Sequence, residues 1–183
     1  MASFSQFPVV SVQYQLALSL VATMHQYQIR KDATPYLGHL LSVSALVMEM
    51  GCTEETAIAA LFHDAIEDLE NPTETISLIQ EKFGKYVLEI VLGVTEQKEL
   101  PKPERKLAYI QQVKDSPLEV VYVSFADKFH NWVNGYARQP ELVDNSVIEF
   151  YQQLIPVFEQ RLHNQVARFY LSVLVESFEK VTG

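Results

Sequence analysis

Residues 61–68 read LFHDAIED, and they form the most informative stretch of this sequence. The pair His63-Asp64 is followed by Glu67 and Asp68, so each of these acids comes four residues after one member of the pair. Residues four apart on a helix share a face, one turn from each other. A helix that only packs a core seldom mixes a histidine and three acids with apolar residues. The stretch therefore predicts a helix with a chemically active face.

Apolar residues recur at helical spacing nearly throughout the chain, so we expect an all-α fold. Gly51 suits the end of one helix, and Thr53 suits the start of the next, which we expect to run through Asp68. Pro156 is expected to kink or split the last helix. The expected helices cover residues 11–28, 37–50, 54–68, 72–84, 85–94, 104–114, 117–134 and 146–180, with loops at 30–35 and 95–104.

Residues 117–134 are the ambiguous segment. The β-branched residues of 120–125 favour a strand. Ser116, Pro117 and Glu119 argue the other way, because serine at the N-cap, proline at the first helical position and glutamate at the third form a capping box. We therefore expect a buried helix here.

Length predicts one domain over residues 1–183. Residues at about 141–183 carry no motif and are expected to be C-terminal packing helices, after the motif-bearing core at about 10–140 that the resemblance described below defines. A net charge of −9 argues against a nucleic-acid polymer as partner, but a small anionic substrate is compatible with a local basic cluster. No apolar run approaches the ~20 residues of a membrane helix, and residues 1–10 lack a signal peptide's pattern. The lone cysteine, Cys52, fits a reducing cytoplasm.

Four residues are candidate metal ligands: His39, His63, Asp64 and Asp127. Imidazole and carboxylate ligands together suit Mn²⁺, Fe²⁺ or Zn²⁺ and leave positions open for water and phosphate. Each residue alone has an ordinary explanation; Asp127, for example, could form a structural ion pair with Lys128. Glu67 and Asp68 are either acid–base groups beside the metal or a solvated helix face. On spacing alone, the catalytic and structural interpretations are evenly balanced.

The ordered motifs resemble one family. They are RKDATPYLGH at 30–39, HDAIED at 63–68, FG at 83–84, GVT at 93–95, LPKPERK at 100–106 and FADKFHN at 125–131. Together they resemble the HD-type hydrolase domain of the Rel/Spo alarmone enzymes, and most of all the single-domain small alarmone hydrolases. The match covers roughly residues 10–140.

The resemblance implies an HD-domain helical bundle with one Mn²⁺ that removes the 3′-pyrophosphate from (p)ppGpp. It implies metal ligation by His39, His63, Asp64 and Asp127, and handling of the attacking water by Glu67 and Asp68. The implied substrate-binding residues are Arg30, Lys31, Lys102, Arg105, Lys106, Lys128 and Asn131. The six basic residues of this set belong to a chain with 14 Lys and Arg, and all lie in or beside the motifs, as an anionic substrate on an acidic protein requires.

The sequence also departs from the family pattern. Ser124 stands where the family usually has lysine, Leu40 follows His39 where proline is usual, and Leu69 replaces the usual threonine. These departures leave all four candidate metal ligands in place, but without the usual lysine the sequence identifies the phosphate-binding residues less clearly. Two alternatives therefore stay open: an HD phosphohydrolase acting on another nucleotide such as NADPH or a dNTP, and a non-catalytic nucleotide-binding relative. The sequence does not define the oligomeric state.

Overall fold

The computed structural model describes residues 10–183, apart from the side chain of Leu142. The sequence interpretation of residues 1–9 lies outside the described part. Within the described residues the secondary structure is helical, with one isolated β-bridge between Ile29 and Pro35. The elements are α1 (Val12–Met24), α2 (Tyr36–Glu49), α3 (Glu54–Leu61), α4 (Ala65–Asp68), α5 (Pro72–Val94), α6 (Lys102–Asp115), α7 (Leu118–Asn134), η2 (Tyr136–Arg138), η3 (Pro140–Leu142), α8 (Asn145–Arg161) and α9 (Gln165–Thr182).

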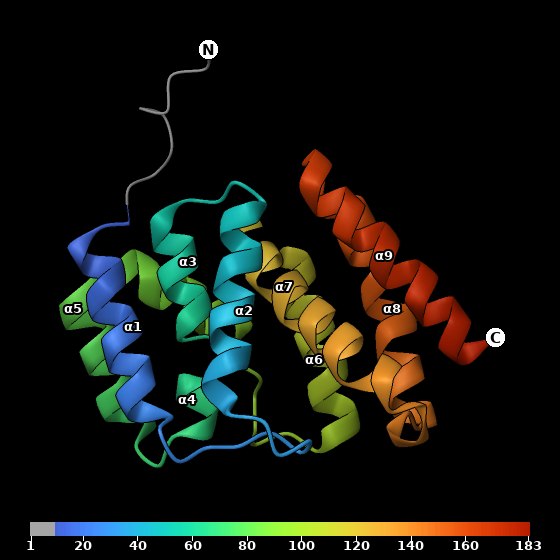
Figure 1. The fold of residues 1–183 in the computed structure, drawn as a ribbon, viewed down its shortest axis with the longest axis horizontal. Coiled ribbons are helices and arrows are strands. Elements are labelled where there is room, and N and C mark those ends of the chain that lie inside the picture. Colours follow the sequence, from blue (N-terminus) through green and yellow to red (C-terminus); the bar gives the residue numbers. More distant parts are fainter. Residues whose placement is uncertain (1–9) are drawn as a thin grey trace.

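The helices α2 and α7 lie at the centre of the molecule (Figure 1). On one side α2 packs against α3, which in turn contacts α1 and α5; on the other side α2 packs against α7. The C-terminal helices α8 and α9 pack against α6 and α7. Residues far apart in sequence therefore meet where α2, α3 and α7 come together.

The helix α7 confirms the helical interpretation of residues 117–134. Its interior positions are buried on nearly every side, which explains why β-branched residues occur in a helix. The proposed capping box is wrong. Pro117 is the N-cap, and the Ser116 hydroxyl donates to the carbonyl of Gln112 at 2.7 Å instead of to the new helix.

The expected continuous helix through Asp68 is also wrong. Helix α3 ends at Leu61, residues 62–64 form a turn, and α4 begins at Ala65. In a continuous helix the Ala60 carbonyl would accept the N–H of residue 64. Here His63 Nδ1 lies 2.8 Å from that carbonyl and takes its place. His63 and Asp64 therefore lie in a turn, which gives them directions that a straight helix does not allow.

The breaks expected at Gly84 and at Pro156 have different outcomes. Gly84 interrupts α5 as expected, with φ of 86°, a conformation that favours glycine. Pro156 lies inside α8, and the chain instead breaks at residues 162–164, where the Asn164 side chain caps α9. Helix α6 begins at Lys102, two residues before the expected start. Among the described helices, none combines the length and apolarity needed to cross a bilayer.

Candidate metal centre and active site

The four predicted metal ligands meet at one point. His39 comes from α2, His63 and Asp64 from the turn after α3, and Asp127 from α7. His39 Nε2 lies 3.1 Å from His63 Nε2 and 3.2 Å from Asp127 Oδ1. Asp64 Oδ2 lies 2.9 Å from His63 Nε2 and 3.6 Å from His39 Nε2. Residues separated by up to 88 positions thus direct donor atoms into one small volume.

These separations suit a shared divalent ion. Donor atoms about 2.1 Å from an ion and at right angles are about 3.0 Å apart, and about 3.4 Å apart in a tetrahedron. His39, His63 and Asp64 place one donor atom each within 4.8 Å of the others. Asp127 Oδ1 adds a fourth, because it lies 3.2 Å and 3.6 Å from the two histidine Nε2 atoms. The cluster can therefore hold a divalent metal.

The charges of the cluster also favour a cation. Burial opposes the ionised forms, but the two carboxylates hold the pKa of His63 well above its usual value. Burial likewise opposes the charge on Asp64, yet His63 and His39 lower its pKa below the usual range. Asp127 also has a pKa well below normal, because Lys128 and the histidines outweigh its burial. Both carboxylates are therefore ionised at neutral pH and available to a cation.

Surrounding side chains hold the donor atoms in place. The Tyr36 hydroxyl donates to Asp64 Oδ2, and the Asn131 amide donates to Asp127 Oδ1 at 2.6 Å. Lys128 donates to the other oxygen of Asp127, also at 2.6 Å. The structural ion pair considered from the sequence therefore exists, but it uses Oδ2 and leaves Oδ1 facing the histidines.

The predicted acid pair lies beside this cluster. Glu67 Oε1 accepts the backbone N–H of Glu96 at 2.8 Å, and Asp68 Oδ2 accepts the Gln28 amide at 3.1 Å. Lys98 lies between the acids, with its ammonium 3.6 Å from Asp68 Oδ1 and donating to the Glu67 carbonyl. Burial raises the pKa of Glu67 to about 7. A carboxyl with that pKa can accept and return a proton near neutral pH.

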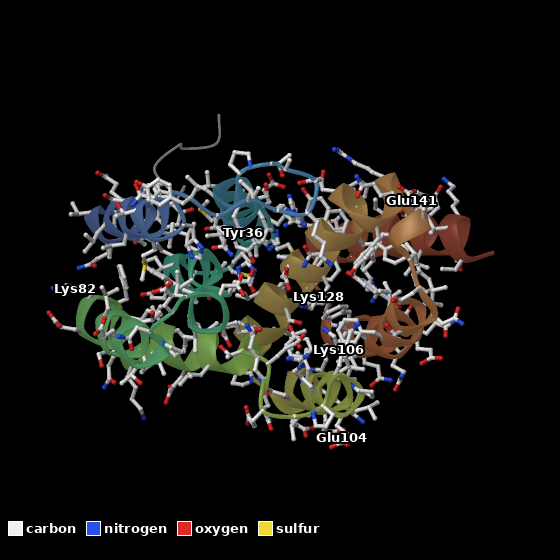
Figure 2. All side chains as sticks on the ribbon, turned by 90° about the horizontal axis from the view of Figure 1, so that it is seen from below. Tyr36, Lys82, Glu104, Lys106, Lys128 and Glu141 are labelled. Atoms are coloured by element: carbon white, nitrogen blue, oxygen red, sulfur yellow. The ribbon has the colours of Figure 1, made fainter. Side chains whose placement is uncertain are left out.

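The predicted substrate-binding residues fall into three groups. Arg30 donates to the Asn131 amide oxygen at 2.9 Å, so these two act as a unit, while Lys31 and Lys102 are exposed. The other members are already paired. Lys106 donates to Glu96 at 2.6 Å, and Arg105 lies 3.5 Å from the same carboxylate. Lys128, whose side chain is 14% exposed, donates to Asp127. In Figure 2, which views the molecule from below, Lys128 lies between Tyr36 and Lys106.

Five residues with close site contacts were missed from the sequence: Gln28, Tyr36, Glu96, Lys98 and His130. Tyr36 and His130 stand three residues from a candidate ligand on the same helix, and that spacing was an available signal. Glu96 and Lys98 lie between α5 and α6 and carried no such signal. His130 Nδ1 lies 2.9 Å from His39 Nδ1, on the side of the ring away from the cluster.

Comparison with known proteins adds an independent line of evidence. A model of the HD domain family matches residues 17–154. The Xenopus tropicalis guanosine-3′,5′-bis(diphosphate) 3′-pyrophosphohydrolase MESH1 is 38% identical over 119 residues, or 63% of this chain and 65% of that protein. Its Drosophila melanogaster counterpart is 33% identical over 125 residues, or 66% and 68% of the two chains. The chain therefore matches about two thirds of the length of these relatives.

A solved structure agrees with the fold. It is described as a metazoan ortholog of SpoT that hydrolyzes ppGpp. The superposition covers 92% of this chain and 97% of the chain in that structure, with a TM-score of 0.76. At 23% identity, this likeness supports the arrangement of helices and nothing finer. Together with the family match, it confirms the all-α helical bundle that the motifs predicted.

Proposed function

This chain belongs to the HD domain family, and from that premise we propose that it is a metal-dependent phosphohydrolase acting on (p)ppGpp. The proposed reaction removes the 3′-pyrophosphate and yields GDP or GTP with pyrophosphate. The observation that carries the proposal is the convergence of two imidazoles and two aspartates, in which each aspartate has an oxygen within 3.6 Å of the Nε2 atoms of both histidines. The similarity to pyrophosphohydrolases named for this reaction supports the substrate.

We assign the ion to His39, His63, Asp64 and Asp127, with Mn²⁺ preferred and Fe²⁺ or Zn²⁺ as substitutes. The donor set fits, because mixed nitrogen and carboxylate oxygen ligands suit these borderline ions. When bound, a divalent ion there supplies Lewis acidity toward water and phosphate oxygens. The lone half-buried Cys52, whose pKa burial raises to about 12, is compatible with the proposed cytoplasmic location.

The acid pair performs the proton transfers in this proposal. Glu67 takes a proton from the attacking water, because its pKa of about 7 matches the working pH. Asp68, held by the Gln28 amide, orients that water. The water oxygen forms a bond to the phosphorus attached to the 3′ oxygen, and the bond between that phosphorus and the 3′ oxygen breaks. Protonated Glu67 returns its proton to the departing 3′ oxygen, so atoms and charge balance.

The basic residues bind the substrate. Arg30 and Asn131 already contact each other at the edge of the cluster and present a guanidinium and an amide together. Exposed Lys31 and Lys102 contribute positive charge and have no ion-pair partner among residues 10–183 that would have to be displaced. Lys106 and Arg105 must exchange Glu96 for phosphate. The half-buried Lys128 acts by fixing Asp127 and by its charge, not by direct contact in this arrangement.

Product analysis tests the proposal. The protein is supplied with Mn²⁺ and given ppGpp, NADPH and a dNTP in separate reactions, and products are identified by ³¹P NMR. We expect GDP and pyrophosphate from ppGpp, no turnover in EDTA, and a large loss in Glu67→Gln. Binding of ppGpp without cleavage, or faster cleavage of another nucleotide, would contradict the assigned reaction.

A further inference from the structure

The two ring nitrogens of His39 face different neighbours. Its Nε2 lies 3.1 Å from His63 Nε2 and 3.2 Å from Asp127 Oδ1, inside the cluster. Its Nδ1 lies 2.9 Å from Nδ1 of His130, outside the cluster. A neutral imidazole carries one proton, so the nitrogen that donates a lone pair to a cation cannot be the one that carries the proton. If Nε2 binds the ion, the His39 proton lies on Nδ1 and points at His130.

His130 is suited to accept that proton. It must be neutral, with its own proton on Nε2, to offer a lone pair at Nδ1. The two ring centroids are 4.9 Å apart and the rings are tilted by 51°, so they are not stacked face to face. The contact is therefore a directed N–H···N hydrogen bond.

The two histidines of the cluster obtain this support in different ways. His63 donates from Nδ1 to the carbonyl of Ala60, three residues earlier in its own chain segment. His39 lies on α2, and its Nδ1 partner is on α7, 91 residues further along the chain. His130 follows Asp127 by three residues, so α7 carries one proposed ligand and the partner of another. The orientation of His39 thus depends on the packing of α2 against α7.

We propose that His130 is a positioning residue that fixes the Nδ1–H tautomer and the ring orientation of His39. The inference rests on the proposed function, because it presupposes that the cluster holds a divalent ion. The outer partner of a metal-binding histidine sets which nitrogen is free and how the ring is aimed. Loss of such a partner typically weakens metal affinity by about 10- to 100-fold.

Metal affinity measured in the full chain tests the proposal directly. Mn²⁺ binding is measured by competition with a chelator for the wild type and three variants. His130→Phe keeps a ring of similar shape but has no acceptor, and we expect about 10- to 100-fold weaker binding. His130→Asn places an acceptor oxygen near the former Nδ1, and we expect it to restore most of the affinity. His163→Phe removes an exposed histidine between α8 and α9 and should leave the affinity unchanged.

A spectroscopic signature separates this role from a merely structural one and does not depend on how His130→Phe folds. In the Zn²⁺-loaded wild type, long-range ¹H–¹⁵N spectra should place the His39 proton on Nδ1. A His39 proton on Nε2, or a folded His130→Phe variant that binds Mn²⁺ as tightly as the wild type, would overturn the inference about His130 but leave the proposed function intact. A wild type that binds no divalent ion would overturn the proposed function as well.

Discussion

Replacing Glu67 with glutamine should stabilise the metal-free protein at alkaline pH while it abolishes turnover. Burial raises the pKa of this carboxyl from 4.5 to about 7. Its side chain is only 14% exposed, so solvent screens the effect little. Each pH unit between the two values corresponds to about 1.4 kcal/mol, so an ionised Glu67 costs the folded state about 3 kcal/mol.

The direction of the pH dependence follows from the proton balance. Below pH 4.5 the Glu67 carboxyl is protonated in both the folded and unfolded states and has no effect. As the pH rises toward about 7, the unfolded chain releases the proton first, so the free energy of unfolding falls. Above about 7 both states are ionised and the penalty is constant. Glutamine does not titrate, and its amide oxygen can still accept the Glu96 N–H.

Urea unfolding followed by circular dichroism in EDTA measures this effect. The free energy of unfolding of Glu67→Gln minus that of the wild type should rise by about 2–3 kcal/mol between about pH 5 and about pH 8. Glu99→Gln, which removes an exposed carboxyl from the loop between α5 and α6, controls for the change in net charge. If the free energy of unfolding of Glu67→Gln minus that of the wild type is the same at both pH values, Glu67 is not a buried carboxyl that exchanges a proton near neutral pH.

Three further substitutions test separate contacts. Asp127→Asn leaves the ammonium of Lys128 buried without its carboxylate, so urea unfolding should show a loss of about 3 kcal/mol as well as weak Mn²⁺ binding; unchanged stability would contradict the ion pair. Arg30→Ala should raise KM for ppGpp about tenfold in steady-state assays with little change in bound metal, since a charged hydrogen bond contributes about 1.5 kcal/mol; a loss of metal instead would contradict its role. Tyr36→Phe removes the hydroxyl that donates to Asp64 and should weaken Mn²⁺ binding about tenfold in calorimetry. If the variant binds Mn²⁺ as tightly as the wild type, this role for Tyr36 is wrong.

The sequence predicted the helical class and most helix positions, because apolar spacing and turn residues act locally. It did not predict the turn at 62–64. That turn depends on the His63 ring taking the Ala60 carbonyl from the backbone, and nothing in helical spacing signals such a competition. The capping box predicted at Ser116 failed for a similar reason, because a side chain bonds to the backbone behind it. The Ser116 hydroxyl donates to the Gln112 carbonyl instead of capping the next helix.

The candidate site, like the fold, could be predicted from the sequence only in part. Residue types and motif order singled out His39, His63, Asp64 and Asp127, but spacing alone left each with an ordinary explanation. Their meeting depends on how α2 packs against α3 and α7, which is a long-range property. The pairing of Lys106 and Arg105 with Glu96 likewise could not be predicted before the packing was known.

The central claim is that one divalent ion, held by the two histidines and two aspartates, is required for hydrolysis. The most direct test titrates Mn²⁺ into metal-free protein while bound metal and ppGpp turnover are measured in the same sample. We predict that both saturate together at one ion per chain, and that His63→Ala shows neither. Full turnover in metal-free protein, or saturable binding and turnover that survive in His63→Ala, would contradict the account.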